Sequence, residues 1–249
     1  MTTDSTSTNS NEHNIIAGVD RAHGRSSMQK GAFFLIHSIS FAICVYVVFG
    51  RDIVLLGRWF GQGWQVVDPF RAKIVLGVTA LYVVRHGITL FYLLQRRVTW
   101  SEAIGLGFFM MLFEVGLCLF AAGLTHRVMV PLGGLDYVSI ALVLIGSYLN
   151  TYSEMQRKWW KNKTENKGKC YTEGLFRLSM HINYFGDCIL FTGWCILTAT
   201  LWTLIFPILM ASMFVLYHIP RLDSYLEERY GDEFREYKER TKKFIPFIY

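Results

Sequence analysis

The sequence predicts an all-α integral membrane protein with six transmembrane helices and a cytoplasmic, amphipathic C-terminal helix. Hydrophobic residues make up 52% of the 249 residues and charged residues only 18%, whereas soluble domains carry about 25% charged residues. The apolar residues are gathered in runs of about 20, the length that crosses a bilayer as a helix. This composition excludes a disordered chain, a coiled coil and a small disulfide scaffold, and it disfavours an ordinary soluble enzyme.

Three regions follow from the distribution of polar residues. Residues 1–28 are almost entirely polar and lack the apolar core of a signal peptide, so we expect a disordered cytoplasmic tail. Residues 29–220 hold the apolar runs and form the predicted transmembrane domain. Residues 221–249 are rich in charge and form the predicted cytoplasmic C-terminal segment.

Six apolar segments are expected to cross the membrane: 31–49, 72–94, 102–124, 137–155, 183–201 and 203–217. The last two form a tight hairpin, and Pro207 is expected to bend the sixth span. Residues 51–70 include Arg51 and Arg58 together with several glycines. They predict a loop with an interfacial or re-entrant piece, with a short seventh span as the alternative.

Basic residues indicate the orientation. They cluster before the first span, between spans two and three, and between spans four and five, where residues 157–177 form a basic loop. With six spans these segments share one side with the C-terminus, and the positive-inside rule places that side in the cytoplasm. Both termini are therefore expected to be cytoplasmic, in the bacterial inner membrane or the endoplasmic reticulum. The net charge of +6 is explained by topology and anionic headgroups, without nucleic acid.

Neither a disulfide framework nor a metal site is expected. The five cysteines are an odd number, and no two have C-x-x-C spacing. The seven histidines are scattered, without ligand spacing from a second histidine or a cysteine.

The segment 221–238 predicts the C-terminal helix. Its apolar and aromatic residues recur at helical spacing between dense charges. A helix that lies on the cytoplasmic face fits this pattern, and a solvated helix with i,i+4 ion pairs is the alternative. The final aromatic residues predict a return to the bilayer interface.

Ionisable residues inside the spans are the candidates for function, because they are costly in a membrane. Arg85 lies 11 residues before Arg96, about 16 Å of helix from that end, and Glu114 is similarly deep in the third span. Arg85 paired with Glu114 in a purely structural contact is the alternative. His37, isolated in the first span, is interpreted as a hydrogen-bonded packing residue.

Two i,i+4 pairs lie nearer the cytoplasmic end, Asn150 with Glu154 and Asn183 with Asp187. Together with the deeper groups they predict a cavity that opens to the cytoplasm, although each residue could instead bond one helix to another. Such a cavity suits a charged cytosolic cofactor that enters from water and a lipid-soluble substrate that enters from the bilayer.

Residues 150–154 (NTYSE) have the pattern N-x-x-S-[DE], and residues 174–187 have the pattern G-L-F/W…N-[FY]-[LF]-G-[ED]. The ending 244–249 (FIPFIY) has the pattern I-P-x-I-[FY]. These three motifs resemble those of the steroid 5α-reductases and the related sterol C14 reductases. Met180 and Ile182 depart from the R-H-P-N core of the sterol reductase branch.

The resemblance implies an NADPH-dependent reductase of a carbon–carbon double bond in a steroid-like or other lipid enone. It implies that the cofactor is held by Asn150, Glu154, Arg157, Asn183, Tyr184, Asp187, Arg221 and Tyr225. The family uses a tyrosine and a glutamate to polarise the substrate carbonyl, and Tyr82 and Glu114 are the nearest candidates here.

Two other functions remain open at this point. An S-adenosylmethionine-dependent methyltransferase of the isoprenylcysteine carboxyl methyltransferase type resembles the chain around residues 227–237. The missing arginine and proline at Met180 and Ile182 count against it. A small transporter or lipid-binding protein is the third possibility, and the lack of internal repeats counts against a transporter.

Overall fold

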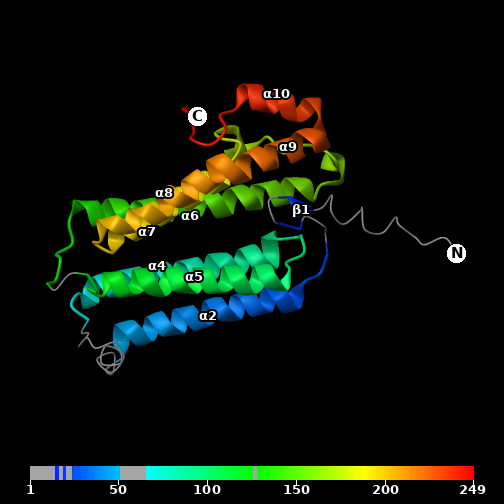
Figure 1. The fold of residues 1–249 in the computed structure, drawn as a ribbon. Coiled ribbons are helices and arrows are strands. Elements are labelled where there is room, and N and C mark those ends of the chain that lie inside the picture. The colour runs from blue at the N-terminus through cyan, green and yellow to red at the C-terminus, as the bar shows by residue number, and fades with distance from the viewer. Residues whose placement is uncertain (1–14, 17–18, 21–23, 51–65, 126–127) are drawn as a thin grey trace.

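A computed structural model describes residues 15–16, 19–20, 24–50, 66–125 and 128–249 (Figure 1). The described helices are α2 (Ser27–Phe49), α4 (Pro69–Ile88), α5 (Trp100–Ala121), α6 (Gly134–Lys161), α7 (Ile182–Leu197), α8 (Ile205–Met213), α9 (Ile219–Tyr230) and α10 (Asp232–Arg240). Short π-helical or 3₁₀ turns are Thr89–Leu93, Thr164–Asn166, Gly174–Arg177, Leu201–Leu204 and Phe214–His218.

The helices confirm an all-α integral membrane protein. Five of them are long and apolar enough to cross a bilayer, namely Ser27–Phe49, Pro69–Leu93, Trp100–Ala121, Gly134–Lys161 and Leu201–Tyr230. The predicted fifth span is the shorter apolar helix Ile182–Leu197. Residues 51–65, which carry the alternative of a seventh span, lie outside the described residues.

The N-terminal segment includes a small hairpin within the predicted disordered tail. β1 (Ile15–Ile16) pairs antiparallel with β2 (Val19–Asp20). Ser26 contacts the connection between α4 and α5, because its hydroxyl accepts a hydrogen bond from Val98 N at 3.0 Å. The proposed domain limits at residues 28 and 220 stay a prediction.

Local sequence explains where α4 and α5 begin. Asp68 precedes α4, its carboxylate accepts from Arg71 N at 3.0 Å, and proline occupies the first helical position. Thr99 precedes α5, and its hydroxyl accepts from Glu102 N at 3.2 Å. Both are standard helix starts, in which a short polar side chain satisfies an orphan backbone N–H.

The bundle has two layers (Figure 1). Helices α2, α4 and α5 pack together in one layer, and α6, α7 and α8 lie in the other. α6 and α7 approach closely through glycines: a Cβ on Gly186 would lie 2.7 Å from Asn150 N, and one on Gly146 would lie 2.5 Å from Leu190 N. Small residues at such crossings let helix backbones meet. All five cysteines lie within the described residues, and each is buried and free of a disulfide.

The sixth span, expected at residues 203–217, and the C-terminal helix, expected at residues 221–238, are continuous in the structure. Leu201–Tyr230 runs as one continuous helical stretch, and Pro207 lies near the start of α8 without breaking it. The break comes at Gly231, which adopts φ +55°, a conformation that glycine reaches without strain. α10 then folds back, and its Phe234 and Tyr237 pack against Cys170 and Met180.

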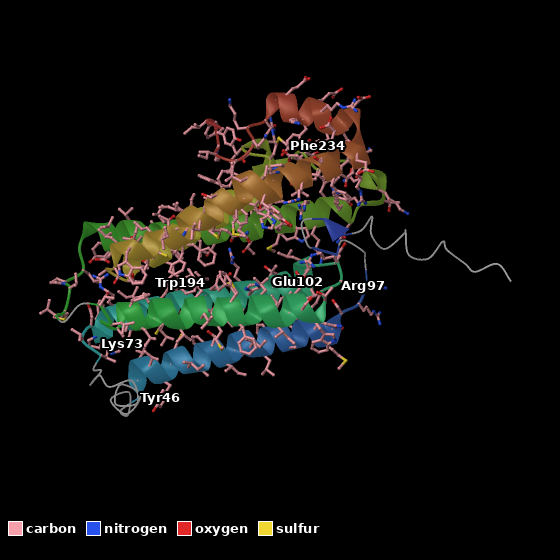
Figure 2. All side chains as sticks on the ribbon, viewed as in Figure 1. Tyr46, Lys73, Arg97, Glu102, Trp194 and Phe234 are labelled. Carbon is pink, nitrogen blue, oxygen red and sulfur yellow. The ribbon has the colours of Figure 1, made fainter. Side chains whose placement is uncertain are left out.

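The connections that the six-span layout places on one side of the membrane lie at one end of the bundle. Figure 2 places Arg97 and Glu102 at one end and Tyr46 and Lys73 at the other. The first end, called here the Arg97 end, also holds the start of α2 and the connection from α6 to α7 (Figure 1). The expectation that this end faces the cytoplasm stays a prediction.

Candidate functional site

The two predicted i,i+4 pairs meet across α6 and α7 in one hydrogen-bonded network. Nδ2 of Asn150 donates to Oδ2 of Asp187 at 2.9 Å and to the carbonyl of Asn183 at 3.0 Å. Nδ2 of Asn183 donates to Oε1 of Glu154 at 2.9 Å, and Arg157 binds the other oxygen of Glu154. The close glycine-mediated crossing of these helices brings the four side chains within reach.

Arg85 links this network to the other layer. Its Nη2 lies 2.9 Å from Oδ1 of Asp187, so the structural pairing with Glu114 considered from the sequence is wrong. The residue is 9% exposed. Its Nε and Nη1 are buried and make no hydrogen bond to any described residue. Because an unpaired buried donor on a charged group is costly, these two atoms make Arg85 a candidate for binding an acceptor oxygen.

A second polar cluster lies among α2, α4 and α5, and it includes His37, for which the sequence suggests a hydrogen-bonded packing role. Nε2 of His37 lies 2.9 Å from Nδ1 of His86, and Nδ1 of His37 lies 2.9 Å from Oε1 of Glu114. His37 and Glu114 are both fully buried. The contact between them is close but poorly aligned as a hydrogen bond, and neither oxygen of Glu114 has another partner among the described residues.

Tyr82 lies between the Arg85 network and the cluster of His37, His86 and Glu114. Its ring lies against His37, His86 and Trp194 with centroid distances of 5.4, 5.3 and 5.3 Å, and the Arg85 guanidinium lies 4.9 Å from the ring centroid. The hydroxyl is 3.9 Å from the sulfur of Met110. Figure 2 shows Trp194 pointing from the upper layer toward the lower one.

The remaining predicted cofactor residues lie on α7 and α9. Tyr184 stacks on His181 and on Phe214, at centroid distances of 5.6 and 4.5 Å. The Arg221 guanidinium lies 3.4 Å from the ring centroid of Tyr217, and the Tyr225 hydroxyl accepts from Arg229. The contacts of these three residues are therefore with neighbouring side chains of the protein.

Sequence reasoning missed a buried pair near this stack. Nε2 of His181 lies 2.8 Å from Oδ1 of Asp223, and their side chains are 2% and 8% exposed. Segment 221–238 contains many acidic residues that the pattern predicts to be exposed, and nothing in the sequence distinguishes Asp223 from them. Within the parts of the chain that the structure describes, no three His, Cys, Asp or Glu residues are grouped as metal ligands.

Comparison with known proteins identifies the family. Residues 33–241 match the family described as "Protein of unknown function (DUF1295)". The chain belongs to the DUF1295 family. It is also 26% identical to the Delta(14)-sterol reductase ERG24 of Saccharomyces cerevisiae over 162 residues, which cover 58% of this chain and 37% of that protein.

A second relative supports the same relationship. The Delta(14)-sterol reductase ERG24 of Candida albicans is 26% identical over 127 residues, which cover 46% of this chain and 28% of that protein. The DUF1295 chain thus spans about a third of the length of these relatives. The resemblance to the sterol reductase-related membrane family, drawn from the motifs, is confirmed.

Proposed function

We propose that this DUF1295 protein is a membrane-embedded, NADPH-dependent reductase of a carbon–carbon double bond in a sterol-like lipid enone. One observation carries the proposal: the buried Arg85 is only partly paired by Asp187, and its Nε and Nη1 have no hydrogen-bond partner among the described residues. A polar ligand with an acceptor oxygen would satisfy them. The similarity to Delta(14)-sterol reductases supports a reductase over the methyltransferase alternative.

The residues around Arg85 suit a dinucleotide. Guanidinium groups bind phosphate and carboxamide oxygens, and amides and carboxylates bind ribose hydroxyls. We assign these roles to Arg85 and Arg157 on one hand, and to the network of Asn150, Asn183 and Asp187 on the other. NADPH would supply the hydride when bound, and the protein would supply position and polarisation.

The second half of the site would bind the lipid. We place the substrate carbonyl on the side of His86 and Glu114, where a preorganised donor would stabilise the developing enolate. Of the two acids suggested by the resemblance, we favour Glu114 as the source of the proton, because the hydroxyl of Tyr82 lies beside the thioether of Met110.

NADPH titration of the detergent-purified protein tests the proposal. Arg85→Gln removes the two unpaired donor atoms and should raise the NADPH Kd about 10- to 100-fold, the value of a lost hydrogen bond to a charged group. The matched control is Arg235→Gln, because Arg235 lies in an exposed ion pair on α10. The double variant with Asp187→Asn avoids an unpaired buried carboxylate and should bind NADPH as weakly.

Two results would contradict the proposal. Wild-type protein that does not bind NADPH would refute the cofactor, and binding of S-adenosylmethionine instead would favour the methyltransferase. An unchanged NADPH Kd in both Arg85 variants would refute the assigned site.

A further inference from the structure

The cluster of His37, His86 and Glu114 has one fully buried end and one half-buried end. Glu114 and His37 lie at its closed end, with no exposed surface, and His86 lies at its half-buried end. His86 follows Arg85 directly in α4, so one helix carries both the half-buried end of the cluster and the arginine of the candidate cofactor site. Three ionisable groups from three helices thus form a line that leads from the interior to the half-buried His86.

Packing alone does not account for these three residues. A buried carboxyl group with no well-formed hydrogen bond destabilises the fold, and an apolar residue of the same size would pack there without that cost. Aromatic rings also surround the line: Phe33 lies 5.0 Å from His86, and Tyr82 lies 5.4 Å from His37. Because these rings restrict water, a proton crossing this region has to move through the side chains.

We propose that Glu114, His37 and His86 form a proton relay that delivers the proton consumed in the reduction, with His86 as the residue that contacts the substrate. The relay rests on the proposed function. Its ground state is uncharged: the Glu114 carboxylic acid faces Nδ1 of His37, His37 carries its proton on Nε2, and His86 carries its proton on the ring nitrogen that faces the site.

The proton balance of the step is simple. As the hydride reaches the β-carbon, the electron pair of the double bond shifts toward the carbonyl oxygen, and His86 gives its Nε2 proton to that oxygen. Nδ1 of His86 takes the Nε2 proton of His37, and Nδ1 of His37 takes the proton of Glu114. The product enol converts to the ketone without net proton change. Water then returns one proton to Nε2 of His86, and the relay protons shift back to Glu114.

The distances within the cluster suit proton transfer between its members. The two links of the relay are each 2.9 Å long, which is a normal hydrogen-bond distance. The link between His37 and Glu114 needs only a small rotation to align, and catalytic hydrogen bonds often tighten when the ligand binds. His37 and Glu114 act through His86 and are positioning residues.

Glu114→Gln is the first variant, because the amide keeps the size of the side chain and can still donate to His37 but cannot give up a proton. Single-turnover reduction of a 3-keto-Δ4 steroid by NADPH should slow about 100-fold, the usual effect of losing general acid catalysis. The NADPH Kd should stay within about twofold, since the change removes an interaction of the transition state. Ser40→Ala, which alters a buried hydroxyl on the same helix as His37, is the control and should match wild type.

His86→Ala tests the group that meets the substrate. It should slow the reaction at least as much as Glu114→Gln, and added imidazole should restore part of the rate in this variant alone. A structural role would not produce such rescue. Infrared spectroscopy gives a readout that does not depend on turnover: wild type should show the C=O stretch of a buried carboxylic acid, and Glu114→Gln should lose that band.

The outcomes separate the two proposals. A wild-type protein that reduces the steroid, with unchanged rates in Glu114→Gln and His86→Ala, would overturn the relay and leave the proposed function standing. A wild-type protein that reduces no enone would overturn the proposed function and the relay with it. Absence of the carboxylic acid band in wild type would overturn the uncharged ground state on which the relay depends.

Discussion

Replacement of Arg71 by leucine should destabilise the protein strongly without altering the candidate site. Arg71 is 1% exposed, and its guanidinium lies between two carboxylates. Nη1 donates to Oδ1 of Asp136 at 2.5 Å and Nε to Oδ2 of Asp68 at 3.4 Å. The same guanidinium donates to the carbonyls of Leu197 and Val130 at 3.0 and 3.1 Å. It therefore ties the start of α4 to the start of α6 and the end of α7.

The magnitude follows from what the substitution leaves behind. Arg71→Leu leaves Asp68 and Asp136, which are 2% and 7% exposed, as buried carboxylates without their cation. Removing one partner of a buried ion pair costs about 3–5 kcal/mol. For a protein of this size each kcal/mol lowers Tm by about 2–4 °C, so we expect a decrease of about 6–20 °C.

The buried cysteines provide the assay. All five thiols are free and buried, so a thiol-reactive fluorogenic dye reports unfolding during a thermal ramp in detergent. Arg235→Leu is the control, because its ion pair with Asp232 is exposed and should contribute less than about 1 kcal/mol. The NADPH Kd of folded Arg71→Leu protein should be unchanged, since Arg71 contacts the carbonyl of Leu197 at the end of α7, whereas Asn183 and Asp187 lie near its start. A Tm within about 2 °C of wild type would refute the reasoning.

Three further predictions concern other parts of the chain. Gly186→Val should prevent the close approach of α6 and α7 and abolish folding or NADPH binding, whereas Gly116→Ala, where a Cβ meets nothing within 4 Å, should be neutral or stabilising by up to about 1 kcal/mol in the same thermal assay. Tyr82→Phe should change kcat by less than about threefold because the hydroxyl faces the Met110 sulfur, and a loss of about 100-fold would make Tyr82 the acid. Burial raises the pKa of the Cys170 thiol to about 11, so at pH 8 its thiolate is scarce; its alkylation, followed by mass spectrometry, should be about 100-fold slower than in unfolded protein and should accelerate as the pH rises toward that pKa.

Hydropathy and spacing predicted the spans and the two polar i,i+4 pairs of α6 and α7 because both depend on local information. An apolar run of about 20 residues has few alternatives to a membrane helix. Asn150 and Glu154 share one helix face, and so do Asn183 and Asp187, whatever the neighbouring helix is. Their mutual contact required one more fact, the glycines at Gly146 and Gly186, whose packing partners the sequence does not identify.

The sequence does not show that the sixth span continues beyond residue 217. Pro220 carries no N–H and normally ends or kinks a helix. In the structure the π-helical turn Phe214–His218 precedes it, and the N–H of Ile219 bonds to the carbonyl of Phe214, five residues back. This wider turn lets the helix pass the proline, and such a local adjustment cannot be inferred from periodicity.

The partners of His37 could not be identified from the sequence because they come from two other helices. Nothing within the first span distinguishes a packing histidine from one that contacts His86 and Glu114. The importance of α4, by contrast, was visible in the consecutive residues Arg85 and His86. On a helix, neighbouring side chains leave the axis about 100° apart, so consecutive polar residues at membrane depth indicate that a helix faces polar groups on two sides.

That arrangement bears directly on the proposed chemistry. Arg85 contacts Asp187 of α7, and His86 contacts His37 of α2, so α4 joins both polar clusters through adjacent residues. Reduction of an enone requires a hydride at one end of the conjugated system and a proton at the other, from groups held in fixed relation to each other. If Arg85 orients the hydride donor and His86 supplies the proton, a single helix sets their separation. A substitution that rotates or shifts α4 should therefore impair NADPH binding and proton delivery together, whereas Arg85→Gln and Glu114→Gln should impair one each.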